Sequence, residues 1–181
     1  ARLVKIPGFS LFNRVFRMFD MEWDKRIFLH DLTKPLPWGE GVASGIYTSH
    51  TLEHLNKEDG RALLNEAYRV LSPGGILRII VPDLNVVLGD LREGKFTADE
   101  LMYRLGVRLS QPKGFSGIIK KLSEYPHQCM YDNSSMVNVL EAIGFEVSLK
   151  KGFESAIEDI DKIEIEGRVV DAVIVEAVKP H

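Results

Sequence analysis

The sequence predicts an α/β fold with a mostly parallel sheet, from three observations along its 181 residues. Residues 76–82, ILRIIVP, form an almost continuous apolar run, which is typical of a strand buried on both faces. A segment with helical spacing of apolar residues joins an earlier strand to this one, which is the order of a βαβ unit. Two strand-like segments near the C-terminus lack a helix of normal length between them, which predicts an antiparallel pair.

The first elements each have a local signal. Residues 26–30 predict a short strand that ends at Asp31, and residues 42–49 predict a buried strand. Asn56 is expected to cap a helix over residues 57–71, because its side chain can accept a hydrogen bond from a free backbone N–H of the first turn. We therefore expect strand, loop, strand and helix in this order.

The later elements follow the same kind of signal, and together with the first they predict one domain over residues 1–181. They are a type II turn at Pro73–Gly74, the strand at 76–82, a mostly helical insertion or lid at about 84–125, a helix at 135–143 capped by Asp132, Asn133 or Ser134 and ended by Gly144, a strand at 145–149, and a last strand at 169–178. The alternation in the last strand favours an edge position, and the acidic segment 154–167 before it is expected to be exposed.

The composition excludes several classes of protein. A formal net charge of −3 argues against a nucleic-acid binder, because phosphate contacts need clustered Lys and Arg. Cys129 is the only cysteine, so an intramolecular disulfide and a cysteine zinc cluster are excluded. No apolar run is long enough for a membrane span and no signal-like start is visible, so we expect a cytoplasmic protein with no membrane partner. The chain begins at Ala1 without Met, which indicates a trimmed or incomplete N-terminus.

Polar residues follow three predicted strands at the point where each strand ends. Asp31, Ser49 and Asp83 come at these ends, and ligands of open parallel sheets bind outside the carboxyl ends of the strands. A carboxylate there can accept hydrogen bonds from ribose hydroxyls or an adenine amino group. Trp38, in the loop between the first two strands, either stacks on a ligand ring or closes the core, and the core is favoured.

A metal site is the first alternative. The stretch HTLEH, from His50 to His54, matches a pattern in which two histidines on one helix face bind zinc and Glu53 acts as a base. The pattern directly follows a strand, Asn56 begins a new helix, and no third-ligand motif follows. We therefore expect no metal, and a zinc hydrolase built on His50, Glu53 and His54 is the least favoured hypothesis.

Longer stretches resemble a known family. HDLTKPLPW, GIYTSHTLEHL and EAYRVLSPGGILRIIVPDL resemble the central part of a class I S-adenosylmethionine-dependent methyltransferase. The likeness is to the small predicted methyltransferase group (type 11-like), and YPHQCMYDNSSMVNVLEAIGFEV resembles a later part of that group. The resemblance implies a Rossmann-like sheet that is mostly parallel with an antiparallel last strand and helices on both faces, and it implies S-adenosylmethionine as cofactor.

The resemblance also implies roles for single residues. Asp31 and Leu32 would border the adenine, and Ser49 and His50 would lie near the methionine moiety or the methyl acceptor. Asp20, or Glu22 close to it, would bind the ribose. The glycine-rich loop through which such enzymes approach the cofactor is missing or degenerate here. A single glycine in ARLVKIPGFS is the remnant, or the loop precedes the part of the chain given by this sequence.

Three functions are compatible with these patterns. The first is methyl transfer from S-adenosylmethionine to a small-molecule or sugar-type acceptor, with His50 or His127 as base and Tyr131 as hydrogen-bond donor. The second is a methyltransferase-like binding or assembly module without catalysis, which the missing loop favours. The third is the zinc hydrolase. His54 is expected to be structural, at the start of the helix, and a homodimer is possible through the last strand or the insertion.

Overall fold

The computed structural model of the protein describes residues 28–105 and 126–181. The chain divides into two compact units, Ala1–Asp31 and Leu32–His181, and all elements named below belong to the second. Residues 28–31 of the first unit have no regular secondary structure, so the strand expected over 26–30 is wrong where it is described, while residues 26 and 27 lie outside the described part. The single domain over residues 1–181 stays a prediction.

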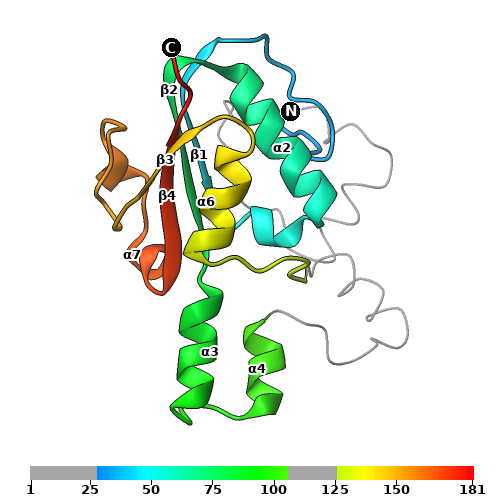
Figure 1. Ribbon diagram of the computed structural model, residues 1–181, viewed down its shortest axis with the longest axis vertical. Coiled ribbons are helices and arrows are strands. Elements are labelled where there is room, and N and C mark those ends of the chain that lie inside the picture. Colours follow the sequence, from blue (N-terminus) through cyan, green and yellow to red (C-terminus); the bar gives the residue numbers. More distant parts are fainter. Residues whose placement is uncertain (1–27, 106–125) are drawn as a thin grey trace, which may run out of the picture. The chain divides into compact units, whose positions relative to one another are not determined.

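Four strands form one mixed sheet in the order β1-β2-β4-β3 (Figure 1). They are β1 (Ala43–Ser49), β2 (Leu71–Pro82), β3 (Glu146–Leu149) and β4 (Ala172–Val178). β1 pairs in parallel with β2, and β4 is antiparallel to both β2 and β3. Three strands therefore run in one direction and the last runs against them, which confirms the predicted Rossmann-like α/β class.

The last strand lies inside the sheet. β4 is hydrogen-bonded to β2 on one side and to β3 on the other, and its five central residues are buried. The antiparallel pairing of β3 with β4 is confirmed, but the edge position expected for β4 is wrong. Most residues of β4 are apolar and they do not alternate strictly with polar ones, because both faces of this strand are covered and neither faces solvent. Among the described strands, β1 and β3 form the two edges.

The βαβ unit is present and consists of β1, α2 (Lys57–Val70) and β2. The Asn56 side chain accepts the Asp59 N–H at 2.8 Å, so the predicted N-cap is confirmed. Gly74 has the expected positive φ of 75°, yet it lies within β2, where the pairing with β1 shifts register. No residue of β1 is fully buried, because β1 is an edge of the described sheet, so the expectation of a buried strand is wrong.

Helices α2 and α6 (Asn133–Glu141) cover one face of the sheet (Figure 1). Side chains of α2, α6, β2 and β4 that point to this face form the apolar core, among them Leu64, Leu77, Met136, Leu140 and Val175. Asp132 caps α6 by accepting the Ser135 N–H at 2.7 Å, and Gly144 ends the segment with a φ of 114°. Both features are as predicted from the sequence.

The opposite face is covered by the segment between β3 and β4, with the short helices η3 (Ile160–Lys162) and α7 (Glu166–Val169) (Figure 1). Helices therefore lie on both faces, as predicted. Ile160 and Glu164 are buried here, so the expectation that residues 154–167 are exposed is wrong at these two positions. The burial of Glu164 is explained by its ion pair with Arg78 of β2.

Three buried ionisable side chains meet on this face: Arg78 of β2, Glu164 and Glu176 of β4. We refer to them as the Arg78 cluster. Arg78 Nε donates to Glu164 Oε1 at 2.6 Å, and its Nη1 donates to Glu176 Oε1 at 3.2 Å. Its remaining donors reach the carbonyls of Glu154 at 2.8 Å and Lys151 at 3.0 Å. Each nitrogen of the guanidinium thus donates at least one hydrogen bond, which fixes the covering segment to the sheet.

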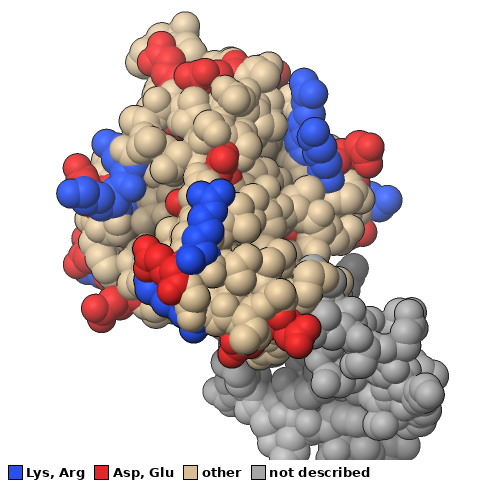
Figure 2. Space-filling model, turned by 60° about the horizontal axis from the view of Figure 1, so that its bottom comes forward, with Lys and Arg blue, Asp and Glu red and all other residues tan. Residues whose placement is uncertain are grey.

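The segment after β2 is helical where it is described. It contains α3 (Leu84–Arg92) and α4 (Ala98–Arg104), while residues 106–125 lie outside the described part. The predicted helical character of this segment is confirmed there, and its role as a lid stays a prediction. None of the helices described for this chain has the length and apolarity needed to cross a membrane. On the face shown in Figure 2, acidic and basic side chains of the described residues are interspersed.

Candidate functional site

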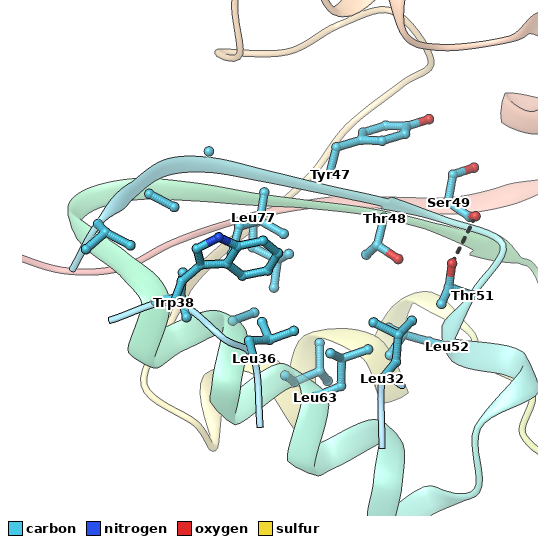
Figure 3. A pocket seen from close by; sticks show the side chains of 17 residues that line it. Leu32, Leu36, Trp38, Tyr47, Thr48, Ser49, Thr51, Leu52, Leu63 and Leu77 are labelled. Atoms are coloured by element: carbon cyan, nitrogen blue, oxygen red, sulfur yellow. Dashed lines mark hydrogen bonds between the residues drawn. The ribbon is translucent and has the colours of Figure 1, made fainter. Parts of the chain in front are cut away.

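A cavity of about 750 Å³ lies between β1, α2 and the segment that leads into β1 (Figure 3). Its lining is mainly apolar, and aliphatic side chains of α2 and of the segment form much of it. At the carboxyl end of β1 the lining becomes polar, with the hydroxyl groups of Thr48 and Thr51 and the backbone carbonyl of Ser49, which accepts the Thr51 hydroxyl at 3.3 Å. The cavity therefore has a long apolar part and a polar end at the edge where the strand finishes.

The indole of Trp38 lies at the end of the cavity opposite the hydroxyl groups (Figure 3). Trp38 is 50% exposed, so the preferred expectation of a core residue is wrong. Its loop is held to α2 by Arg69, which donates to the carbonyls of Trp38 at 2.9 Å and Leu36 at 3.1 Å. Glu66 accepts the Leu36 N–H at 2.7 Å, and the neighbouring Arg69 lowers the pKa of its carboxyl group.

The residues after β1 do not continue as a regular α-helix. His50 has a left-handed φ of 51°, and the following helix η2 is a single 3₁₀ turn over Leu52–His54. The helix face on which the zinc alternative would place His50 and His54 together is therefore not formed. The His50 N–H donates to the carbonyl of Ile80 at 2.9 Å, which keeps the chain beside β2 before it turns away.

Both ring nitrogens of His50 face oxygen atoms. Nε2 is 3.0 Å from the carbonyl oxygen of Arg168 in α7, and Nδ1 is 3.4 Å from Oε1 of Glu53. The contact with the Glu53 carboxylate is the main reason why the pKa of His50 is raised, although partial burial opposes it. The cationic form of His50 is thus favoured more than in a free histidine, and both of its nitrogens are already directed at acceptors.

Glu53 lies at the centre of a second group of buried polar side chains. The group consists of Glu53, His54 and His127, which we refer to as the Glu53 cluster, and their ligand atoms all lie within 4.8 Å of one another. The Glu53 side chain is 1% exposed, and neither of its oxygens has a hydrogen-bond partner. The Nδ1 atoms of His54 and His127 are also buried and without a partner. Buried polar atoms are rarely left in this state, so the cluster needs an explanation.

One predicted catalytic residue, His127, belongs to this cluster, and another, Tyr131, lies near enough for the Glu53 charge to act on it. Burial lowers the pKa of His127, so its neutral form, with a free Nδ1, is favoured at neutral pH. Burial also raises the pKa of Tyr131 to about 12, with Cys129 and Glu53 contributing. Tyr131 therefore keeps its proton and can act as a hydrogen-bond donor, as its predicted role requires.

Other predicted site residues are distributed between the cavity and the first unit. Leu32 and Ser49 line the cavity. Asp31 belongs to the first unit and Asp20 lies outside the described residues, so their expected contacts with adenine and ribose stay predictions. The sequence interpretation used Glu53 only as a zinc-bound base, and it missed that a carboxylate between two histidines in HTLEH would be buried.

Comparisons with known proteins bear on the identity of the chain. Residues 17–79 match a family model described as a methyltransferase domain, and this match includes β1, η2 and α2. The predicted resemblance to class I methyltransferases is confirmed. No curated protein matches the chain.

Solved methyltransferases also resemble it. An O-methyltransferase family protein from Burkholderia thailandensis is 14% identical, with a TM-score of 0.50 over 84% of this chain and 35% of that one. The 1,6-didemethyltoxoflavin-N1-methyltransferase of the same organism is 12% identical, with a TM-score of 0.49 over 99% of this chain and 59% of that one. A SAM dependent methyltransferase from Archaeoglobus fulgidus is 16% identical, with a TM-score of 0.42 over 78% of this chain and 62% of that one.

The chain is thus similar in fold to a methyltransferase at low sequence identity, as the O-methyltransferase family protein indicates. It spans between 35% and 62% of the length of these three structures. The matched segment 17–79 contains β1, along which the cavity lies, and η2, which carries Glu53 and His54.

Proposed function

We propose that this methyltransferase domain binds S-adenosylmethionine in the cavity beside β1 and transfers its methyl group to a small-molecule or sugar-type acceptor. The observation that carries the proposal is the cavity itself, which is apolar along β1 and polar at the carboxyl end of that strand. Ligands of open α/β sheets bind at this edge. When bound, the cofactor supplies a methyl group activated by a sulfonium.

The lining of the cavity fits part of this cofactor. The Trp38 ring and the leucines at positions 32 and 36 offer apolar contacts for a purine, and the hydroxyls of Thr48 and Thr51 offer polar contacts. No carboxylate of the described residues lines the cavity, so a partner for the ribose hydroxyls is still required. Asp20 is the predicted partner.

The acceptor side is assigned to the polar residues after β1. Methyl transfer requires the donor and acceptor atoms to be aligned, and modest assistance in removing the acceptor proton. His50 is a weak candidate for the base, since both of its nitrogens face oxygen atoms. His127 and the other atoms of the Glu53 cluster are better suited, because they are unpartnered, and Tyr131 can donate a hydrogen bond beside them.

Isothermal titration calorimetry with S-adenosylmethionine and S-adenosylhomocysteine tests the proposal. We expect micromolar binding to the full chain, and we expect Trp38→Ala to weaken it by about tenfold, because base stacking on an aromatic ring contributes about 1–3 kcal/mol. The matched control is Tyr103→Ala in α4, which removes an aromatic ring that is 80% exposed and outside the cavity.

Absence of heat with both ligands would contradict the proposal. The second predicted function, a non-catalytic module of the methyltransferase type, would then be favoured, and the lack of an acidic residue in the described lining is the observation that supports it. Equal weakening by Trp38→Ala and Tyr103→Ala would show that the cavity beside β1 is not where the ligand binds.

A further inference from the structure

We propose that Glu53, His54 and His127 bind a divalent transition-metal ion. The sequence interpretation weighed a different set, in which His50 was the second histidine ligand, and it expected no metal. The structure brings His127 to Glu53 and His54 instead, from a segment 73 positions further along the chain than His54. The inference does not depend on the proposed function, because metal binding is measured without cofactor or acceptor.

The unpartnered atoms are the first argument. Both oxygens of Glu53 and Nδ1 of both histidines are buried and make no hydrogen bond. An isolated buried carboxylate is costly, and proteins keep such a group when it is paired or coordinates a metal. His50 compensates the charge only in part, since its Nδ1 is 3.4 Å from Oε1 and this contact lacks hydrogen-bond geometry.

The chemistry of the three ligand atoms is the second argument. Two imidazoles and one carboxylate are a common ligand set for Zn²⁺ and for other divalent metals of the first transition row. Ligands bonded at about 2.1 Å to a tetrahedral ion lie roughly 3.4 Å apart. The contact of His54 with Glu53 is made by Nε2 and not by the buried Nδ1, at 3.8 Å from Oε1. One nitrogen of each histidine and one oxygen of Glu53 lie within 4.8 Å of one another, so small side-chain rotations are enough.

The backbone holds the two ligand segments together. The carbonyl of Glu53 accepts the N–H groups of Gln128 at 2.6 Å and of Cys129 at 3.2 Å. The Gln128 side chain donates to the carbonyl of His54 at 2.7 Å. The rings of His54 and His127 are in edge contact, with centroids 5.0 Å apart. A site whose ligands are held by such surrounding bonds is preorganised for metal binding.

Three protein ligands leave at least one coordination position open in a tetrahedral site. The exposed fractions of the side chains are 32% for His54 and 1% for Glu53, so the cluster is closed on the carboxylate side and open on the His54 side. A hydroxyl group or a water molecule is the oxygen ligand that fits this position. The metal would then lie beside Tyr131, next to the predicted acceptor side.

Calorimetry of the untagged full chain, treated with EDTA and dialysed, tests the proposal with Zn²⁺ and Mn²⁺ as probes and Mg²⁺ as the hard-cation control. We expect one Zn²⁺ per chain, with weaker Mn²⁺ binding and little or no binding of Mg²⁺. Bound Co²⁺ should give visible absorption bands of a low-coordinate site, which is a readout that depends on the ligands and not on activity.

Variants identify the ligands. Glu53→Gln and His127→Asn should each weaken Zn²⁺ binding by at least about tenfold, whereas His50→Asn should have a smaller effect. The matched control is His181→Asn, which removes an exposed histidine outside the cluster. Circular dichroism and thermal unfolding of each variant check the fold. Folded Glu53→Gln and His127→Asn variants that bind Zn²⁺ like the wild type would overturn the proposal.

The outcome is separable from that of the proposed function. Trp38→Ala should leave Zn²⁺ binding unchanged, and Glu53→Gln should leave S-adenosylmethionine binding measurable, because Trp38 is not in the Glu53 cluster and Glu53 does not line the cofactor cavity. A chain that binds Zn²⁺ through His50 and not through His127 would contradict the ligand set proposed here and support the one weighed from the sequence.

Discussion

The Arg78 cluster and the Glu53 cluster bury similar groups in opposite states. In the first, Glu164 and Glu176 each accept a hydrogen bond from Arg78, and the guanidinium also donates to two carbonyls. In the second, the Glu53 carboxylate is as deeply buried but has no hydrogen bond, and two histidine nitrogens beside it are also unpartnered. Burial alone therefore does not tell what a charged residue is for.

The difference indicates that the Arg78 cluster stabilises the fold, whereas the Glu53 cluster is suited to binding a ligand. A buried charge costs several kcal/mol to desolvate, and hydrogen bonds to an opposite charge offset most of this cost. The Arg78 cluster meets that condition within the chain and needs no ligand. The Glu53 cluster does not, so the chain keeps an unfavourable carboxylate that a metal ion would satisfy. The predictions below test this division.

Removing the central cation should have the largest effect. Arg78→Ala leaves two buried carboxylates without their partner, and we expect the free energy of unfolding to fall by about 3–5 kcal/mol. Urea unfolding followed by circular dichroism measures it. Lys162→Ala, which breaks the exposed Lys162–Asp159 pair, is the control and should cost much less. A similar loss in the two variants would contradict the role given to the Arg78 cluster.

The two carboxylates can be compared directly by the same substitution in EDTA. Glu164→Gln should lower the free energy of unfolding by about 2 kcal/mol, because the bond from Arg78 loses its charged acceptor. Glu53→Gln should change it by less than about 1 kcal/mol, because no hydrogen bond is lost and only the 3.4 Å contact with His50 is weakened. Equal losses in urea unfolding would mean that Glu53 is a structural residue like Glu164.

Gly152 tests the packing around the Arg78 cluster without changing a charge. A Cβ at this position would lie 2.7 Å from Cβ and Cγ2 of Val169 in α7, so Gly152→Ala should cost about 1–3 kcal/mol by overpacking. In α3, Gly89→Ala meets nothing within 4 Å and should be neutral or slightly stabilising. Thermal unfolding distinguishes the two. A neutral Gly152→Ala would show that α7 can move away from the sheet at no cost.

The smallest effect is expected for Gln128, which is not part of the Glu53 cluster but donates a hydrogen bond to the backbone of His54. Gln128→Ala removes the bond to the His54 carbonyl and should cost about 0.5–1.5 kcal/mol in unfolding free energy. Because His127 is the next residue, Zn²⁺ binding measured by calorimetry should also weaken. Asn65→Ala removes a similar amide-to-carbonyl bond, to Arg61 in α2, and should leave Zn²⁺ binding unchanged. Unchanged binding in both variants would mean that this bond does not position His127.

The order of elements could be predicted from local signals. The cap at Asn56, the apolar run in β2 and the glycine at position 144 depend on neighbours in sequence, so β1, α2, β2 and α6 were expected close to where they lie. The place of β4 could not be predicted in this way, since an apolar strand fits an inner position of the sheet as well as an edge. Its pairing with β2 decided it.

The candidate site shows the same contrast between features set by local sequence and features set by distant contacts. The sequence by itself determined the fold class, the resemblance to methyltransferases, and the presence of Ser49 and His50 at the end of a strand, because these follow from periodicity and short motifs. Only the tertiary structure decided that His127 joins Glu53 and His54, and that Arg78 is paired with Glu164. Both are contacts between residues more than 70 positions apart, and side-chain chemistry alone does not choose among distant partners.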